Sequence, residues 1–327
     1  MMSWLLILLI IGLILFALTN IHTFVGLIVL GLLYQFVSTK LDREEYQSPG
    51  KLVSVGDHRL HINCSGTGNA GPTIVLDSGL GMSSLDWSKV QPEIAKFARV
   101  CSYDRAGYGW SEEGKNPRTS ERMVEELHTL LHNASVPTPY VLVGHSLGGT
   151  NMLLFAEKYP GEVAGLVLVD AVHGDQIKEI ATTIEPDYTW VEKCINNRFI
   201  KTYCGGERFL YQFMPHYFGE HVFEPSIQKI MILQAVTLRF ANAFDGEYAS
   251  FGKSLSQVNY APGLLKELPL VVISATQNRP VDWQEQQKKL VSLSSKSSQV
   301  MADKSDHFIE RNQPELIVEA VRTLIQK

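Results

Sequence analysis

The sequence has few cysteines, no cluster of basic residues, and no charge near its amino terminus. Its 327 residues include four Cys, none in a C-x-x-C pair, which disfavours a disulfide-stabilised secreted module and a zinc knuckle. Lys and Arg number 29 against 34 Asp and Glu, a net charge of −5, and this mildly acidic balance without a basic cluster argues against a nucleic-acid partner. The apolar fraction of 45% is nevertheless enough for a large buried core.

The first 39 residues contain no Lys, Arg, Asp or Glu. Two apolar runs, 4–18 and 24–37, are separated by the polar, turn-like segment 19–23. A helix over either run is about 21–23 Å long, and one helix over both is about 50 Å, against a hydrocarbon core of ~30 Å. We therefore predict a membrane segment over residues 1–39, as one helix or as a hairpin of two. A cleaved signal peptide would need a basic n-region and an A-x-A site, which the sequence lacks.

The orientation of this segment is predicted from the cations that follow it. Lys40, Arg43 and Lys51 are the first of these, and only the amino terminus precedes the segment. The positive-inside rule then places the globular part in the cytoplasm. If that part faced outward instead, Cys194 and Cys204 could form a disulfide, and the sequence leaves their pairing open.

After a predicted linker over residues 40–50, short apolar runs alternate with helical patterns over residues 51–327. Runs of four or five apolar residues, each followed by a helix, are typical of strands in a mostly parallel sheet that is buried on both faces. The fold class is therefore α/β. The predicted strands are 52–55, 59–64, 73–77, 99–104, 140–143, 166–170 and 270–274.

Residues 174–262 interrupt this alternation with a segment that is helical in pattern and rich in aromatic residues. Most of these aromatic side chains are expected to pack among themselves. The segment leaves the sheet at the carboxyl end of strand 166–170, however, where α/β sheets place their ligand sites. We therefore interpret it as a helical lid, and its aromatic content predicts an apolar substrate.

The candidate nucleophile is Ser146, the centre of a G-x-S-x-G motif over residues 144–148. The motif lies directly after a predicted buried strand and directly before a predicted helix. Small residues two positions on either side allow a sharp bend, which holds the serine hydroxyl clear of the sheet and at the positive end of the helix.

A serine hydroxyl needs a base, because it is hardly ionised at neutral pH. His307 is the candidate, since it lies in the loop between the apolar stretch 300–302 and the predicted terminal helix 314–325. His145, beside Ser146, is expected to point away from the nucleophile. Solvated or packing roles are expected for the histidines of a helix face and of a hairpin, which are His128, His132, His58 and His61.

Residues from about 51 to the carboxyl terminus resemble serine hydrolases of the α/β-hydrolase fold, which include esterases, lipases and proline iminopeptidases. The resemblance rests on the turn at 77–81, the stretch 103–111, the Ser146 motif and the His307-Phe308 loop. It implies a catalytic triad, an acyl-enzyme intermediate, and neither a metal nor a cofactor. It assigns Asp104 and Arg105, within the second stretch, a bracing role beneath the site.

The acid of the triad departs from the commonest pattern of the fold. Its usual position, after strand 270–274, holds Asn278, which cannot stabilise an imidazolium by charge. A minority of the fold, including haloalkane dehalogenases, places the acid one strand earlier, and Asp170 matches that position. We assign Asp170 to hold His307. The rivals are Asp282, which requires a longer loop, and Asp306, which would have to turn back on the histidine.

An oxyanion hole is expected from two backbone N–H groups, those of Leu147 and Leu80. Leu147 follows the nucleophile, and Leu80 lies in the turn 79–81. The glycine spacing of that turn does not fit the dinucleotide motif G-x-G-x-x-G.

The resulting hypothesis is a membrane-anchored serine hydrolase that cleaves an ester or related acyl bond. Its expected partners are a small apolar acyl substrate and, through the amino terminus, the lipid bilayer. A peptidase, a carbon–carbon bond hydrolase and a perhydrolase remain open on the same fold. Dehalogenase and epoxide hydrolase mechanisms are disfavoured because they use a carboxylate in place of Ser146. A non-catalytic, membrane-held binding protein is supported only by Asn278.

Overall fold

The computed structural model describes most of the chain, in two compact units. One unit contains residues 1–47, 187–220 and 236–238, and the other contains 48–186, 221–235 and 239–327. The described residues are 11, 12, 15, 20–66, 71–176, 202–213 and 223–326.

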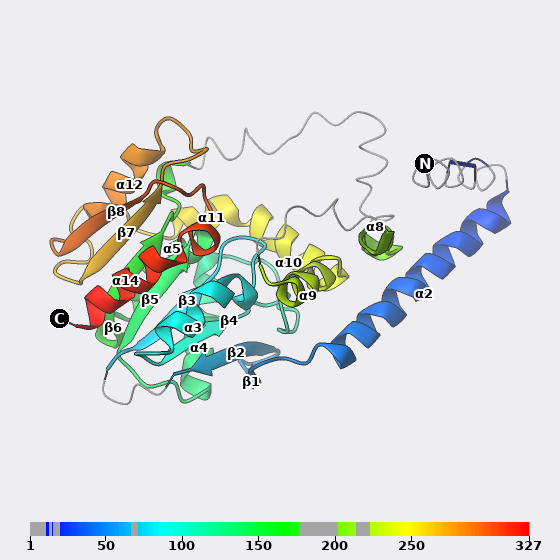
Figure 1. Cartoon of the computed structure of the whole chain (residues 1–327), viewed down its shortest axis with the longest axis horizontal. Helices are drawn as coiled ribbons and strands as arrows, with labels where there is room; N and C mark the ends of the chain where they lie inside the picture. The colour runs from blue at the N-terminus through cyan, green and yellow to red at the C-terminus, as the bar shows by residue number, and fades with distance from the viewer. Residues whose placement is uncertain are drawn as a thin grey trace. The chain divides into compact units, whose positions relative to one another are not determined.

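The larger unit is built on a sheet whose eight strands follow the order β1-β2-β4-β3-β5-β6-β7-β8 (Figure 1). Strand β2 is antiparallel to both neighbours, and the strands from β4 to β8 are parallel, which confirms the predicted mostly parallel sheet. The strands are β1 (Lys51–Ser54), β2 (Arg59–Ser65), β3 (Thr73–Asp77), β4 (Val100–Tyr103), β5 (Tyr140–His145), β6 (Val163–Val169), β7 (Leu270–Ala275) and β8 (Ser297–Ala302).

Helices cover both faces of this sheet, which explains why its central strands are apolar throughout. One face packs against α4 (Ser120–Asn133), α5 (Leu147–Lys158) and α12 (Trp283–Val291). The opposite face packs against η1 (Ser84–Lys89), α3 (Gln91–Ile94), α13 (Ile309–Asn312) and α14 (Pro314–Ile325).

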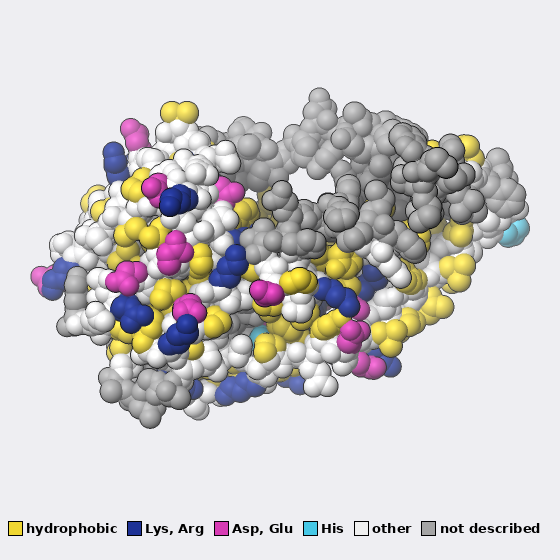
Figure 2. Space-filling model, viewed as in Figure 1, with side chains coloured by type: hydrophobic (Ala, Val, Ile, Leu, Met, Phe, Trp, Pro, Cys, Tyr) yellow, Lys and Arg dark blue, Asp and Glu magenta, His cyan; other side chains and the backbone are white. Residues whose placement is uncertain are grey.

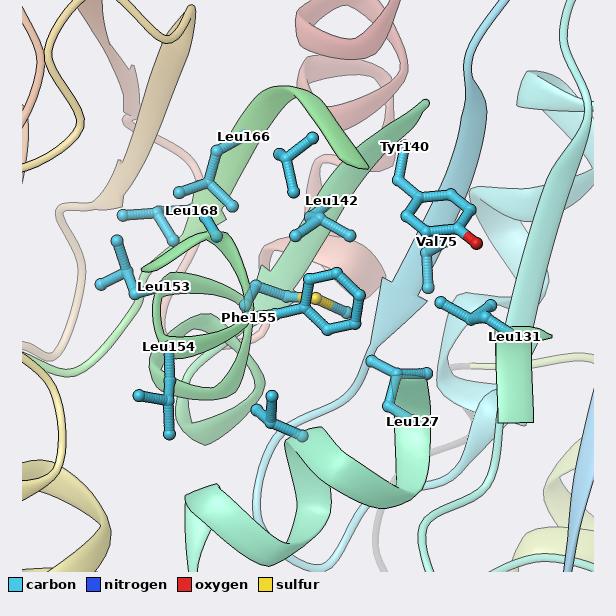
Figure 3. Close-up of a cluster of buried hydrophobic side chains, with 14 of the residues drawn as sticks. Val75, Leu127, Leu131, Tyr140, Leu142, Leu153, Leu154, Phe155, Leu166 and Leu168 are labelled. Carbon is cyan, nitrogen blue, oxygen red and sulfur yellow. The ribbon is translucent and has the colours of Figure 1, made fainter. Parts of the chain in front are cut away.

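The core between α4, α5 and the sheet is shown in Figure 3. Phe155 of α5 is fully buried there with Leu127 of α4 and Leu142 of β5. Each fully buried side chain of this kind contributes about 1.5–3 kcal/mol to folding. This packing fixes α5, and with it the first residue after β5.

The described part of the predicted lid is helical. It contains η3 (Gly174–Gln176), α8 (Gly206–Phe213), α9 (Pro225–Ala235), α10 (Leu238–Ala249) and α11 (Phe251–Ser256). In the larger unit, Phe251 and Leu255 of α11 pack with Met123 of α4 and with Leu147. Helix α11 of the predicted lid therefore packs against the elements that carry the candidate site.

The smaller unit contains α2 (Ile21–Glu45), whose segment Val25–Glu45 is long and apolar enough to be a candidate membrane span. The helix runs into the predicted linker 40–50, where Leu41, Arg43 and the two glutamates that follow are good helix formers. Its last turn is closed by the Tyr46 N–H, which donates to the Asp42 carbonyl at 2.8 Å. Most of the preceding apolar run lies outside the described residues.

One side of α2 carries polar groups that bind α8 within the same unit. Arg208 of α8 is buried, donates to Gln35 Oε1 at 3.0 Å, and pairs with Asp42. The Gln35 amide in turn donates to the Val236 carbonyl at 2.6 Å. The rest of α2 exposes apolar side chains (Figure 2), among them Val29, Leu30, Leu33 and Phe36.

A disulfide joins Cys64 of β2 to Cys101 of β4, which are directly opposite each other in the antiparallel pair. No pattern in the sequence marks this pair, because the two positions meet only when the sheet has formed. Cys204 is a free thiol in the part of the chain that the structure describes, and Cys194 lies outside it.

Candidate active site

Ser146 lies at a strained bend between β5 and α5, as the motif predicts. Its φ of 53° and ψ of −119° fall in a region that side-chain-bearing residues rarely adopt. The flanking glycines permit the bend: a Cβ on Gly144 would lie 2.4 Å from the Gly148 carbonyl oxygen, and one on Gly148 would lie 2.4 Å from that of Asp77. The Ser146 N–H donates to the Val169 carbonyl at 3.1 Å, which ties the bend to the end of β6.

The structure brings the three predicted triad residues together. His307, in the loop between β8 and α13, has its Nε2 2.9 Å from the Ser146 Oγ. Its Nδ1–H donates to the Asp170 Oδ2 at 2.7 Å. The serine, histidine and carboxylate thus form a continuous hydrogen-bonded chain, although they come from three separate loops.

Asp170 is fully buried directly after β6, with a φ of 43°. Its Oδ1 accepts the Ala275 N–H at 2.9 Å and the Trp283 Nε1–H at 2.7 Å. Its Oδ2 accepts from His307 and also lies 3.1 Å from the Arg279 Nε. These contacts hold the carboxylate in one orientation and compensate for the free-energy cost of burying its charge.

The two rival carboxylates do not contact the His307 ring. Asp282 precedes α12, where its Oδ2 accepts from the Gln286 amide at 3.2 Å. Asp306 accepts the Phe308 N–H at 3.1 Å and so shapes the loop that carries the histidine.

The predicted oxyanion donors lie on two neighbouring segments. Leu147 is the first residue of α5, so its N–H has no acceptor within the helix. Leu80 lies in the turn after β3, which the Met82 N–H closes by donating to the Gly79 carbonyl at 3.2 Å. The Leu80 side chain packs against the buried cluster that contains Leu147, so the two segments are neighbours.

Arg105 is buried and braces this turn, as the resemblance implies. Its guanidinium donates to the Ser78 carbonyl at 2.6 Å, to the Gly79 carbonyl at 2.8 Å, and to the Asp77 carboxylate at 2.7 Å. Glu247 of α10 accepts from the same guanidinium at 2.7 and 3.0 Å. Burial alone would lower the pKa of Arg105, but the two carboxylates raise it well above its usual value. One cation therefore joins the lid helix to the turn.

Asp104 braces a second set of loops. It accepts the Ser84 N–H at 2.7 Å and the Trp110 N–H at 3.0 Å, and its Oδ2 lies 2.8 Å from the His61 Nδ1. Burial would raise the pKa of this carboxyl, but His61 and the backbone donors hold it below its usual range. His61 is thus a buried partner of Asp104.

His145 has a role that sequence reasoning missed. Its Nε2–H donates to the His307 carbonyl at 2.8 Å, and the centres of the two rings lie 4.6 Å apart. Burial and the neighbouring His307 hold the pKa of His145 well below its usual value, so it is neutral. Burial, with Asp86 nearby, raises the pKa of the adjoining Glu310 to about 8. The only signal in the sequence for this role of His145 is its position in the motif, directly before Ser146.

Helix α10, in the predicted lid, carries a row of aromatic rings and also lines a separate cavity. Phe240, Phe244 and Tyr248 form a row of stacked rings, and Phe244 lies 3.0 Å from the position a Cβ on Gly81 would take. A separate cavity of about 630 Å³ lies between α10 and the loop 106–118, and no triad residue lines it. In the described residues, no group of three His, Cys, Asp or Glu is placed to hold a metal ion.

Comparison with known proteins identifies the fold. Residues 72–194 match a family model described as the alpha/beta hydrolase fold. The uncharacterised protein YqjL of Bacillus subtilis is 28% identical over 76% of this chain and 82% of its own. Cfl2 of Burkholderia cenocepacia aligns with a TM-score of 0.64 and 21% identity, over 84% of this chain and 95% of that one. The enol-lactonase of Burkholderia xenovorans aligns with a TM-score of 0.59 and 20% identity, over 85% of this chain and 100% of that one.

The strand order, the bend at Ser146 between β5 and α5, and the helices on both faces of the sheet all agree with these similarities. The chain therefore has the α/β-hydrolase fold, and its amino-terminal apolar helix is a candidate membrane span.

Proposed function

We propose that the protein is a membrane-anchored serine hydrolase that cleaves an ester or related acyl bond. The observation that carries the proposal is the chain from the Ser146 Oγ through the His307 ring to the Asp170 carboxylate, with lengths of 2.9 and 2.7 Å. Matching structures that include an enol-lactonase, an epoxide hydrolase and a thermophilic esterase support a hydrolase as the class of activity.

In this proposal His307 accepts the proton of Ser146 while the Oγ attacks the substrate carbonyl. Asp170 stabilises the imidazolium, and the N–H groups of Leu80 and Leu147 donate to the developing oxyanion. The imidazolium then gives its proton to the leaving alcohol. Water, deprotonated by His307, attacks the acyl-enzyme and releases the acid with Ser146 restored.

The proposed substrate has an apolar acyl group. The aromatic row of α10 lies against Gly81, next to the proposed oxyanion donor Leu80, and Phe244 and Tyr248 are each more than a third exposed. These rings offer a carbonyl substrate an apolar wall beside the reacting carbon. A peptidase, a carbon–carbon bond hydrolase or a perhydrolase would use the same triad, and comparing p-nitrophenyl esters with aminoacyl-proline amides separates esterase from peptidase.

The proposed anchor is α2, whose exposed face is apolar. Two features of the chain favour opposite orientations of this anchor in the membrane. The cations Lys40, Arg43 and Lys51 favour a cytoplasmic globular domain. The Cys64–Cys101 disulfide favours an oxidising compartment, because cytosolic thiols are kept reduced. The redox state of these two cysteines in cells therefore distinguishes the orientations.

Labelling with a fluorophosphonate tests the function. The wild type is expected to react covalently, and Ser146→Ala is expected not to react. Ser135→Ala is a matched control, because Ser135 also has a positive φ but is exposed and outside the triad, so that labelling should persist. If the folded wild type is not labelled and hydrolyses no acyl substrate, the protein is a non-catalytic member of the fold.

A further inference from the structure

The loop after β7, where this fold commonly carries the triad acid, instead brings a cation to the triad. Arg279 extends its Nε to within 3.1 Å of the Asp170 Oδ2, the same oxygen that accepts the His307 Nδ1–H. The contact is an ion pair without hydrogen-bond alignment. The imidazole and the guanidinium therefore share one carboxylate oxygen.

The position of Arg279 is fixed by stacking. Its guanidinium carbon lies 3.4 Å from the centre of the Trp283 ring, and the same indole donates its Nε1–H to the other Asp170 oxygen at 2.7 Å. The Arg279 side chain is 14% exposed. Burial lowers the pKa of Arg279, but an arginine stays protonated in the working range of a histidine base. The triad thus has a fixed positive charge beside its acid.

We propose that Arg279 is a positioning residue that extends the activity of His307 to lower pH, by competing with the imidazolium for the Asp170 carboxylate. The inference rests on the proposed serine-hydrolase function. A guanidinium and an imidazolium that share one carboxylate oxygen repel each other, so the cation at Asp170 opposes a second positive charge on the neighbouring ring. Arg279 also stacks on Trp283, whose ring lies edge-on to that of His307 with 6.0 Å between the ring centres, so the guanidinium has a second contact besides Asp170.

The other groups around His307 do not supply this charge. His145 is neutral, the pKa of Glu310 is raised to about 8 by burial, and Arg311 is paired with Asp86 at 2.7 Å. In the described part of the chain, Arg279 is therefore the cation in contact with the triad carboxylate. The charged and titratable groups that face His307 from its own loop and from the adjoining elements are Asp170, Arg279, His145, Asp306, Glu310 and Arg311.

The test is the pH profile of kcat/KM for a p-nitrophenyl ester. Arg279→Met removes the charge but keeps an apolar stem over Trp283, and it should raise the midpoint of the acid limb by about one pH unit. Arg279→Lys keeps the charge and should leave the midpoint within a few tenths of a unit. Lys304→Gln, in the loop before His307 and exposed, removes an equal charge away from Asp170 and should not move the midpoint.

Fluorophosphonate labelling gives the fraction of folded, active protein in each variant and separates two kinds of failure. If the wild type is not labelled, the proposed function fails. If Arg279→Met is labelled but its acid limb stays at the wild-type midpoint, Arg279 only packs on Trp283 and the inference is overturned. Should Arg279→Met not fold, Arg279→Gln is measured instead, and the same unchanged midpoint overturns the inference.

Discussion

Replacing Asp170 with asparagine tests the assignment of the triad acid. The Ala275 N–H and the Trp283 Nε1–H both donate to Oδ1, so the single amide oxygen of an asparagine must take that position. The amide nitrogen then lies at the Oδ2 position, opposite the His307 Nδ1. An amide N–H is a donor, and it requires His307 to carry its proton on Nε2, where it can no longer accept the proton of Ser146.

This reversed tautomer sets the size of the expected effect. Asparagine in place of a triad aspartate lowers kcat by about 10⁴-fold, which corresponds to roughly 5.5 kcal/mol of transition-state stabilisation. In this site the amide N–H also faces the cation of Arg279, so no favourable contact replaces the lost ion pair between Arg279 and the carboxylate. KM should change far less than kcat, because the buried carboxylate does not face the substrate.

The assay is steady-state hydrolysis of a p-nitrophenyl ester, with circular dichroism and a thermal melt to show that the variants fold. Asp282→Asn and Asp306→Asn are the matched controls, because they make the same chemical change at the two rival acids, and each should stay within about threefold of the wild type. The assignment is refuted if Asp170→Asn retains more than a tenth of the wild-type kcat, or if a control variant loses activity while Asp170→Asn does not.

Three further outcomes follow from buried groups. Glu247→Gln leaves the buried Arg105 with one carboxylate fewer, so the free energy of unfolding should fall by about 3–5 kcal/mol, measured by urea denaturation. The pKa of Glu310 is about 8 in the folded protein against an ordinary 4.5, so stability should fall as pH rises from about 4.5 to 8. Glu310→Gln should flatten that slope in melts at several pH values. Alkylation of the denatured, unreduced protein should leave Cys64 and Cys101 unmodified, and their modification in protein taken directly from cells would support the cytoplasmic orientation.

Much of the fold and of the candidate triad could be predicted because the signals are local in sequence. The nucleophile bend requires glycines at fixed positions around Ser146, and it lies between an apolar strand and a helix. Asp170 could be found through the resemblance, because a minority of the fold places the acid directly after the strand that follows the nucleophile helix. Once the strands are known to be parallel, their carboxyl ends share one edge of the sheet, and residues at those ends meet.

Contacts between side chains far apart in sequence could not be predicted in this way. Glu247 reaches Arg105 from a lid helix, and no periodic pattern marks a helix residue that pairs with a loop cation. The hydrogen bond from His145 to the His307 carbonyl likewise depends on how two loops approach each other. The cross-strand disulfide required the register of β2 against β4, which apolar patterning alone leaves open.

The unusual position of the proposed triad acid has a geometric explanation in the sheet. Strands β6 and β7 are parallel neighbours with Val169 opposite Ile273, so their carboxyl ends lie about 4.8 Å apart. A carboxylate from either end can therefore reach the same histidine, and moving the acid to Asp170 does not require His307 to move. The loop after β7 then does not need to carry the acid. A second carboxylate there would repel Asp170, whereas the cation of Arg279 is attracted to it, which makes a basic residue the electrostatically favoured occupant of this loop.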